Sequence, residues 1–79
     1  MRSSATLPAS PVLTIIVNGA SHIVRRHEAT VADVLRDLAL EGKRVAVEKN
    51  GAIVPRSQHA ATCVGVGDRI EIVAAVGGG

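Results

Sequence analysis

The sequence RVAVEKNGAIVP, residues 44–55, carries the pattern that decides the fold. Its first half alternates valine with small or charged residues, which is typical of a strand with one buried face. Asn50-Gly51 follows, and this dipeptide accepts the positive φ angles that a two-residue hairpin turn requires. A second short strand, 52–54, must end at Pro55, because proline cannot donate a hydrogen bond to a sheet ladder. The stretch therefore predicts a β-hairpin.

Strands are also predicted on both sides of this hairpin. Residues 13–18 (LTIIVN) are rich in β-branched side chains and run into a second Asn-Gly turn, so 21–25 are expected to return as an edge strand. Residues 69–76 (RIEIVAAV) predict the last strand. Asp68 is expected to be the turn residue that starts it.

One helix is predicted between the two hairpins. Thr30 can cap its first turn, and Asp33 occupies the capping-box position, where its charge also complements the helix N-terminus. We expect the helix to end at about Leu40, with Gly42 as its C-terminal cap. Its apolar residues follow the i, i+3, i+4, i+7 spacing of a single stripe. They are Val31, Val34, Leu35 and Leu38.

The predicted order β-β-α-β-β-β indicates a two-layer α+β domain, because one helix with a single apolar stripe needs a sheet to cover it. A chain of 79 residues has room for one domain. We expect residues 1–11, rich in Ser and Pro, to form a flexible arm, residues 12–76 to fold, and residues 77–79 (GGG) to form a flexible tail. Segment 56–64 is predicted to be an irregular crossing with one helical turn near 57–60.

The composition excludes several function classes. The sequence has no Phe, Trp or Tyr, so the core must be aliphatic and the stacking platforms of single-strand nucleic-acid binders are missing. A net charge of +2 with scattered basic residues also argues against nucleic acid as a partner. No stretch reaches the roughly 18 apolar residues of a membrane span, and residues 1–11 lack the apolar region of a secretory signal. We therefore expect a cytoplasmic protein.

Cysteine and histidine give no sign of a site. Cys63 is the only cysteine, so an internal disulfide is excluded, and a lone cysteine with an apolar neighbour is expected to be a small buried hydrophobe. His22, His27 and His59 lack metal-ligand spacing, so no metal is expected. His59 lies near Cys63 in the sequence, but no third orienting group accompanies them. We therefore predict no catalytic residue in this chain.

The feature that carries chemistry is the tail. Three extended residues span roughly 10 Å. Because glycines have no side chains, such a tail can enter a narrow channel in a partner protein. Gly77 and Gly78 are therefore predicted to thread into the partner. The carboxylate of Gly79 is a poor electrophile, so acyl chemistry there needs activation, for example adenylation with ATP. A sulfur nucleophile can then displace the adenylate and leave a thiocarboxylate. Gly79 is therefore the predicted modified residue.

Several segments resemble one known family. They are 17–19 (VNG), 30–35 (TVADVL), 45–51 (VAVEKNG), 53–56 (IVPR), 67–73 (GDRIEIV) and 76–79 (VGGG). Together with the order of elements, they are similar to the ubiquitin-like β-grasp sulfur carriers, and among these to the ThiS type of thiamine biosynthesis. The likeness covers about residues 13–79. A terminal Gly-Gly alone is a weak motif, whereas the 45–56 block followed by GDRIEIV and the glycines is far more specific.

The resemblance implies a mixed sheet of four to five strands packed on one main helix. It also implies that the chain is a carrier and not an enzyme. An E1-like adenylyltransferase (ThiF-type) would adenylate Gly79 with ATP-Mg, and a sulfur donor such as a cysteine desulfurase would supply the sulfur. Thiazole synthase (ThiG-type) would then take the sulfur from the thiocarboxylate to build the thiazole ring of thiamine.

An apolar surface near the tail is the predicted docking face. Val73, Ala75 and Val76 are its candidate residues, because exposed apolar area on a small protein often marks an interface. The family often carries an aromatic residue just before the tail, where this chain has Ala74-Ala75. The docking surface is therefore expected to be weaker, or matched to a different pocket. Glu48 is expected to be an ordinary surface residue without a role in the chemistry.

Two alternatives stay open at this point. The chain could be a sulfur carrier of another pathway, such as the small subunit of molybdopterin synthase, although those relatives tend to be richer in Phe and Pro before the glycines. It could also be a β-grasp interaction module, in which the sheet binds a partner and the tail does no chemistry.

Overall fold

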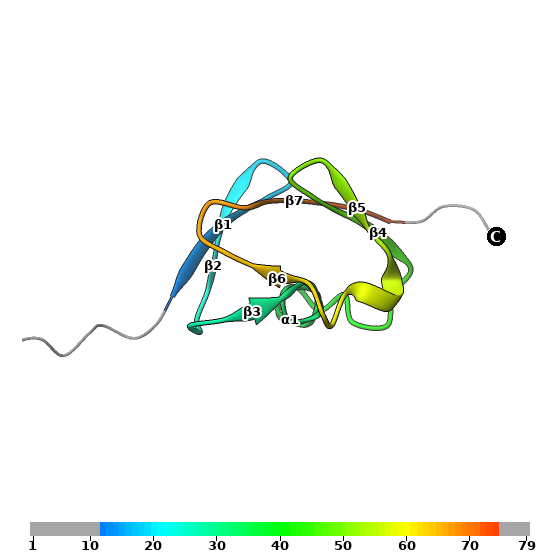
Figure 1. Ribbon diagram of the computed structural model, residues 1–79, viewed down its shortest axis with the longest axis horizontal. Helices are drawn as coiled ribbons and strands as arrows, with labels where there is room; N and C mark the ends of the chain where they lie inside the picture. Colours follow the sequence, from blue (N-terminus) through cyan, green and yellow to red (C-terminus); the bar gives the residue numbers. More distant parts are fainter. Residues whose placement is uncertain (1–11, 75–79) are drawn as a thin grey trace, which may run out of the picture.

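The computed structural model describes residues 12–74 of the chain. The predicted arm, the predicted tail and the docking residues Ala75 and Val76 lie outside this range. Within it, a mixed sheet of five strands covers one face of the helix α1 (Figure 1). The predicted two-layer α+β fold is confirmed.

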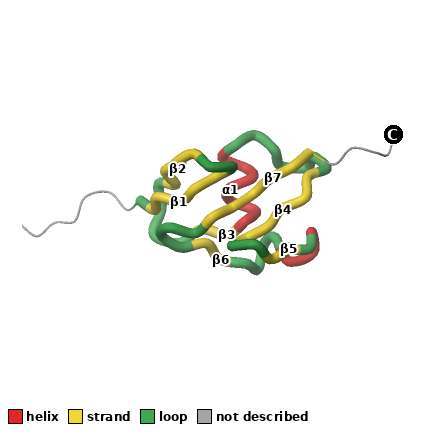
Figure 2. Tube along the Cα trace, turned by 90° about the horizontal axis from the view of Figure 1, so that it is seen from above, coloured by secondary structure: helices red, strands yellow, loops and turns green. Residues whose placement is uncertain are grey.

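The sheet has the strand order β2-β1-β7-β4-β5. Its members are β1 (Leu13–Val17), β2 (Ala20–Val24), β4 (Val45–Lys49), β5 (Ala52–Val54) and β7 (Arg69–Ala74). Both predicted hairpins are present, because β1 pairs with β2 and β4 pairs with β5 in antiparallel fashion. The last strand, β7, lies between them, parallel to β1 and antiparallel to β4. Figure 2 shows β7 running across the middle of the sheet, above α1.

A second, two-stranded sheet was missed by the sequence patterns. It joins β3 (Ala29–Thr30) to β6 (Cys63–Val64) in antiparallel fashion on the helix side of the molecule (Figure 1). The predicted crossing at 56–64 therefore contains a strand as well as its helical turn, the 3-10 helix η2 (Arg56–Gln58). Two-residue strands are too short to carry a periodic signal.

The beginning of α1 (Val31–Asp37) confirms the predicted capping box. The Asp33 backbone N–H donates to Thr30 Oγ1 at 3.2 Å, and the Thr30 backbone N–H donates to Asp33 Oδ2 at 2.9 Å. Two free donors of the first turn are thereby satisfied. The Thr30 bond is the main reason why the pKa of Asp33 lies below its ordinary value, with help from the charges of Arg26 and Arg36.

The predicted end of the helix was wrong. The helix ends at Asp37, and the residue with left-handed backbone angles is Ala39, at φ +62°. The N–H of Leu40 donates to Leu35 O at 2.7 Å, and the N–H of Ala39 donates to Arg36 O at 3.0 Å, which is the Schellman pattern of a helix end. The early reversal allows Leu40 to pack against the core. Gly42, at φ +79°, belongs to the following turn.

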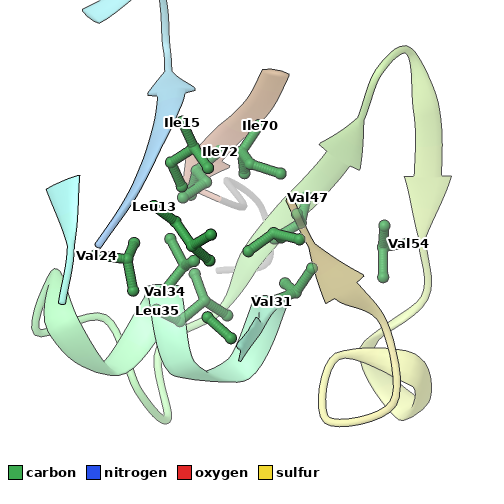
Figure 3. Packing of buried hydrophobic residues seen from close by; sticks show 12 residues of the cluster. Leu13, Ile15, Val24, Val31, Val34, Leu35, Val47, Val54, Ile70 and Ile72 are labelled. Atoms are coloured by element: carbon green, nitrogen blue, oxygen red, sulfur yellow. The ribbon is translucent and has the colours of Figure 1, made fainter. Parts of the chain in front are cut away.

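The core is aliphatic throughout, as predicted. Side chains from the inner face of the sheet meet the helix stripe, in which Val31 and Val34 are fully buried and Leu35 is nearly so (Figure 3). Each fully buried side chain of this size contributes about 1.5–3 kcal/mol. The sheet contributes Leu13, Ile15, Val24, Val47, Val54, Ile70 and Ile72 to this cluster.

Cys63 does not belong to the core, and its predicted burial was wrong. The side chain is exposed, because β6 turns Val64 inward and so directs its neighbour outward. A histidine that is not part of the aliphatic cluster is buried nearby in the sequence. His59 is 9% exposed, and its Nε2 lies 3.1 Å from the carbonyl oxygen of Val54.

Replacing Ala39 by glycine should stabilise the protein. A side chain at positive φ is strained, so Ala39→Gly is expected to raise the free energy of unfolding by about 0.5–1 kcal/mol. Urea unfolding followed by circular dichroism measures the change. Ala32→Gly, within the helix, is the control and should lower the same quantity by about 0.5–1 kcal/mol. A loss of stability in both variants would contradict the assignment of the helix end.

Candidate functional site

The strand that leads to the tail is held by the side chain of Asn18. Its Oδ1 accepts a hydrogen bond from the Ile72 backbone N–H at 2.7 Å, and its Nδ2 donates to the Ile72 carbonyl at 3.1 Å. The backbone N–H of Asn18 also donates to Ile70 O at 2.9 Å. The β1–β7 register ends at Val17 and Ile70. The Asn18 amide therefore continues the β1 ladder by one more step.

Asn50 holds the beginning of the same strand from the other side. Its Oδ1 accepts a hydrogen bond from the Arg69 backbone N–H at 2.9 Å, and its own backbone N–H donates to Arg69 O at 2.7 Å. Its Nδ2 donates to Asp68 Oδ1 at 3.1 Å. Both hairpin turns thus contact β7 through their first residue, once from β1 and once from β4.

The backbone conformation of the two turns explains why asparagine occupies both positions. Asn18 and Asn50 have φ values of +51° and +52°, and the glycines after them have φ values of +86° and +88°. Positive φ at both central residues is the type I′ geometry that matches the twist of paired strands. Asparagine tolerates this region better than other residues with side chains. The turn thereby aims a side-chain amide at the neighbouring strand.

Asp68 anchors the turn that precedes β7, as predicted. Its carboxylate accepts hydrogen bonds from the Gly65 backbone N–H at 2.7 Å and from Asn50, and Lys49 Nζ lies 3.8 Å away. Partial burial alone would raise the pKa of Asp68, but the bonds from Asn50 and Gly65 and the charge of Lys49 together hold that pKa below its ordinary value. Lys49 Nζ also donates to Cys63 O at 2.8 Å.

Only one predicted docking residue lies in the described part of the chain. Val73 is on the outer face of the sheet, away from α1, and is 61% exposed. It stands opposite Ala46 of β4, which is also exposed. Gly77, Gly78 and Gly79 lie beyond the described residues, so their assigned roles remain predictions.

Comparison with known proteins gives the family. A family model described as the ThiS family matches residues 10–79. The chain belongs to the ThiS family. The match includes both Asn-Gly hairpins, β7 and the three glycines.

A solved structure of a ThiS protein has the same fold. The chain is similar to the crystal structure of the thiamine biosynthesis protein ThiS from Geobacter metallireducens, at 32% sequence identity and a TM-score of 0.74. The likeness covers 85% of this chain and 100% of that one. The ubiquitin-like β-grasp fold implied by the sequence is therefore confirmed.

A curated relative is much longer than this chain. It is named thiazole synthase, comes from Paramagnetospirillum magneticum, and is 41% identical over 69 residues. That alignment takes in 85% of this chain but only 20% of the relative. This chain therefore spans about a fifth of the length of the curated protein that it matches.

The described residues contain no cluster of side chains that could hold a metal ion. Between residues 12 and 74, no group of three or more His, Cys, Asp or Glu side chains is placed to hold a metal ion. In the same range, no helix is long and apolar enough to span a membrane. His22, His27 and His59 are not brought together with Cys63 into such a group. Within this ThiS-family domain, the structural feature next to the tail is the anchored strand β7.

Removing the Asn18 side chain should loosen β7 locally. Asn18→Gly keeps a residue that accepts positive φ but loses two hydrogen bonds, so we expect the free energy of unfolding to fall by about 1–2 kcal/mol. Amide hydrogen exchange should accelerate most at Ile72, whose N–H loses its acceptor. The Ile70 amide serves as the internal control. Equal changes at both amides would show that Asn18 does not hold this part of the strand.

Loss of the Asp68 charge should make the free energy of unfolding less dependent on pH in the acid range. Because the folded pKa of Asp68 is below its ordinary value of 3.8, its contribution is present above that value and is lost as pH falls through the folded pKa. Asp68→Asn is expected to cost about 1–2 kcal/mol at neutral pH. The difference from wild type should shrink towards pH 2. Urea titrations between pH 7 and pH 2 measure it, and a difference that stays constant would refute the sign.

Proposed function

We propose that this chain is the sulfur carrier of thiamine biosynthesis, and that its reactive group is the carboxylate of Gly79. The observation that carries the proposal is the family match, which continues past the described residues through Gly77, Gly78 and Gly79. The similar protein from Geobacter metallireducens is described as a thiamine biosynthesis protein. The longer relative is named for thiazole synthase. Both names belong to the same pathway.

The proposed chemistry begins with activation of the carboxylate. An E1-like adenylyltransferase of the ThiF type binds ATP-Mg, a carboxylate oxygen of Gly79 attacks the α-phosphorus, and pyrophosphate leaves. A sulfur nucleophile then attacks the carbonyl carbon, the C–O bond to AMP breaks, and a C–S bond remains. If the donor is a persulfide, such as that of a cysteine desulfurase, a thiol must reduce the acyl disulfide to release the thiocarboxylate. In this scheme the chain itself binds no cofactor.

The chain contributes geometry to these steps. Glycine leaves the carbonyl carbon unhindered, and Gly77 and Gly78 can adopt the backbone angles that a partner channel imposes. The described domain ends in β7, which is held by ladders on both sides and by Asn18 and Asn50. When a partner binds this domain, the position at which the tail leaves β7 is therefore fixed relative to that partner. Thiazole synthase of the ThiG type is the proposed acceptor of the sulfur.

Val73, Ala75 and Val76 are proposed to form the apolar contact with these partners. In the described part of this surface, the exposed Val73 and Ala46 stand side by side on neighbouring strands. Small apolar side chains at this point leave room for a bulkier apolar group of the partner. This would compensate for the missing aromatic residue at Ala74-Ala75.

The thiocarboxylate itself is the decisive test. We expect that incubation with a ThiF-type enzyme, ATP-Mg and a sulfur donor replaces one oxygen of the chain by sulfur, as measured by intact mass spectrometry. Fragmentation should locate the sulfur on Gly79. The control is a chain that lacks Gly78-Gly79, which retains residues 12–74 and should gain no sulfur. If the wild-type chain stays unmodified under conditions that thiolate an established ThiS protein, the proposal is refuted.

The pathway is tested separately in cells. A bacterial strain without its own thiamine sulfur carrier should grow without added thiazole when it expresses this chain, and should need thiazole when it expresses the form without Gly78-Gly79. Rescue of a strain that lacks the small subunit of molybdopterin synthase, without rescue of the thiazole requirement, would assign the carrier to the other pathway. Full rescue by the truncated form would indicate an interaction module.

A further inference from the structure

Both hairpin turns contain a chemically labile dipeptide. In an Asn-Gly sequence the backbone nitrogen of glycine can attack the side-chain carbonyl carbon of asparagine, because no glycine side chain hinders the approach. The C–N bond to the amide nitrogen breaks, and ammonia leaves with the proton that the glycine nitrogen gives up. Water then opens the resulting succinimide to aspartate, or to isoaspartate with one more methylene in the backbone. Asn18-Gly19 and Asn50-Gly51 are both candidates for this reaction.

The attacking nitrogen is accessible in both turns. Among the described residues, neither the Gly19 N–H nor the Gly51 N–H donates a hydrogen bond. Apart from chain neighbours, no atom lies within 4 Å of the point where a side chain on either glycine would begin. Asn50 lines one shallow surface hollow and Gly51 lines another, so water reaches this turn. The reaction is therefore limited by the asparagine side chain, which must first leave its hydrogen-bond partners.

The side chain of Asn18 is held firmly. Both of its hydrogen bonds reach the backbone of Ile72 in the central strand, and both are partly buried. Water replaces such bonds poorly, so opening them is costly. The β1–β2 hairpin that carries this turn is paired along five residues of each strand. Asn18 therefore leaves its native position rarely.

The side chain of Asn50 is held less firmly. Its bonds to the Arg69 N–H and to the carboxylate of Asp68 are both exposed, so water can replace them at low cost. The β4–β5 hairpin pairs only three residues of each strand, and β5 is an edge strand that ends before Pro55. Such short, exposed elements open at a low free energy. The carbonyl carbon of Asn50 therefore approaches its glycine more often than that of Asn18.

We propose that Asn50 is a site of spontaneous deamidation, and that the product loosens the beginning of β7. An aspartate here lacks the Nδ2 donor that now bonds Asp68 Oδ1 at 3.1 Å, so two carboxylates would face each other. Lys49, whose Nζ lies 3.8 Å from Asp68 Oδ2, can compensate only one of these charges. Isoaspartate would lengthen the backbone of a two-residue turn and disturb the strand register. The reaction needs only water and does not depend on the proposed function.

Site-resolved mass spectrometry tests the reaction itself. The folded chain is kept in mildly alkaline buffer, samples are digested over time, and the deamidated fraction is measured for each Asn-Gly peptide. We expect Asn50 to react at least about fivefold faster than Asn18. In concentrated urea, where neither side chain keeps its partners, the two rates should agree. Equal rates in the folded chain, a faster reaction at Asn18, or no reaction at either site would overturn the proposal.

The variant Asn50→Asp tests the effect of the product. Because Asp-Gly also accepts this turn, the variant changes the charge and the donor but keeps the turn geometry. We expect the midpoint of thermal unfolding to fall by about 4 °C or more. Amide exchange should accelerate at Arg69, at the beginning of β7, whereas the Ile72 amide, which Asn18 still holds, is the internal control.

A second background isolates the carboxylate pair. In Asp68→Asn, the added change Asn50→Asp should lower the midpoint less than it does in wild type, because no second carboxylate faces the new one. An unchanged or higher midpoint in the single variant Asn50→Asp would overturn the proposal. An equal fall in both backgrounds would also overturn it, because the loosening would then not come from the repulsion between residues 50 and 68.

Discussion

The position of β7 at the centre of the sheet is the constraint on which the rest of the structure depends. This strand comes last in the described chain, yet it lies between two hairpins that were made earlier in the sequence. Both hairpins hold it through backbone ladders and through the side-chain amides of Asn18 and Asn50. If β7 were removed, β1 and β4 would each lose a neighbour and the core would lose Ile70 and Ile72.

This arrangement suits the proposal that the chemistry of the protein takes place at Gly79. The inner residues of β7 tie the strand to an aliphatic core, while its outer residues remain available to a partner. One strand therefore connects the stability of the domain, the proposed docking face and the proposed reactive tail. A small platform without aromatic residues can fulfil this role, because the core needs only to fix the direction in which the tail leaves. The catalytic groups are proposed to belong to the partner.

Most of the fold could be predicted from local patterns. The Asn-Gly dipeptides marked both hairpins, and Thr30 with Asp33 marked the start of the helix. Each of these signals acts over a few residues, so the sequence displays it directly. The left-handed residue Ala39 beyond the helix end was missed because glycine is the usual residue at such a position, and packing of Leu40 against the core outweighed that preference. Cys63 was misplaced because the two-residue strand β6 has no detectable period.

The sequence by itself determined the aliphatic core, the two hairpins, the helix start and the family. It also indicated Gly79 as the residue that is chemically modified. Only the tertiary structure decided which groups meet on β7. Asn18 is 54 positions from Ile72 in the chain, and no local pattern connects them. Glu48 and Glu71 stand opposite each other only because β4 and β7 adopt one register. Such pairings depend on how distant strands align to bury their inner faces, which no short stretch of sequence specifies.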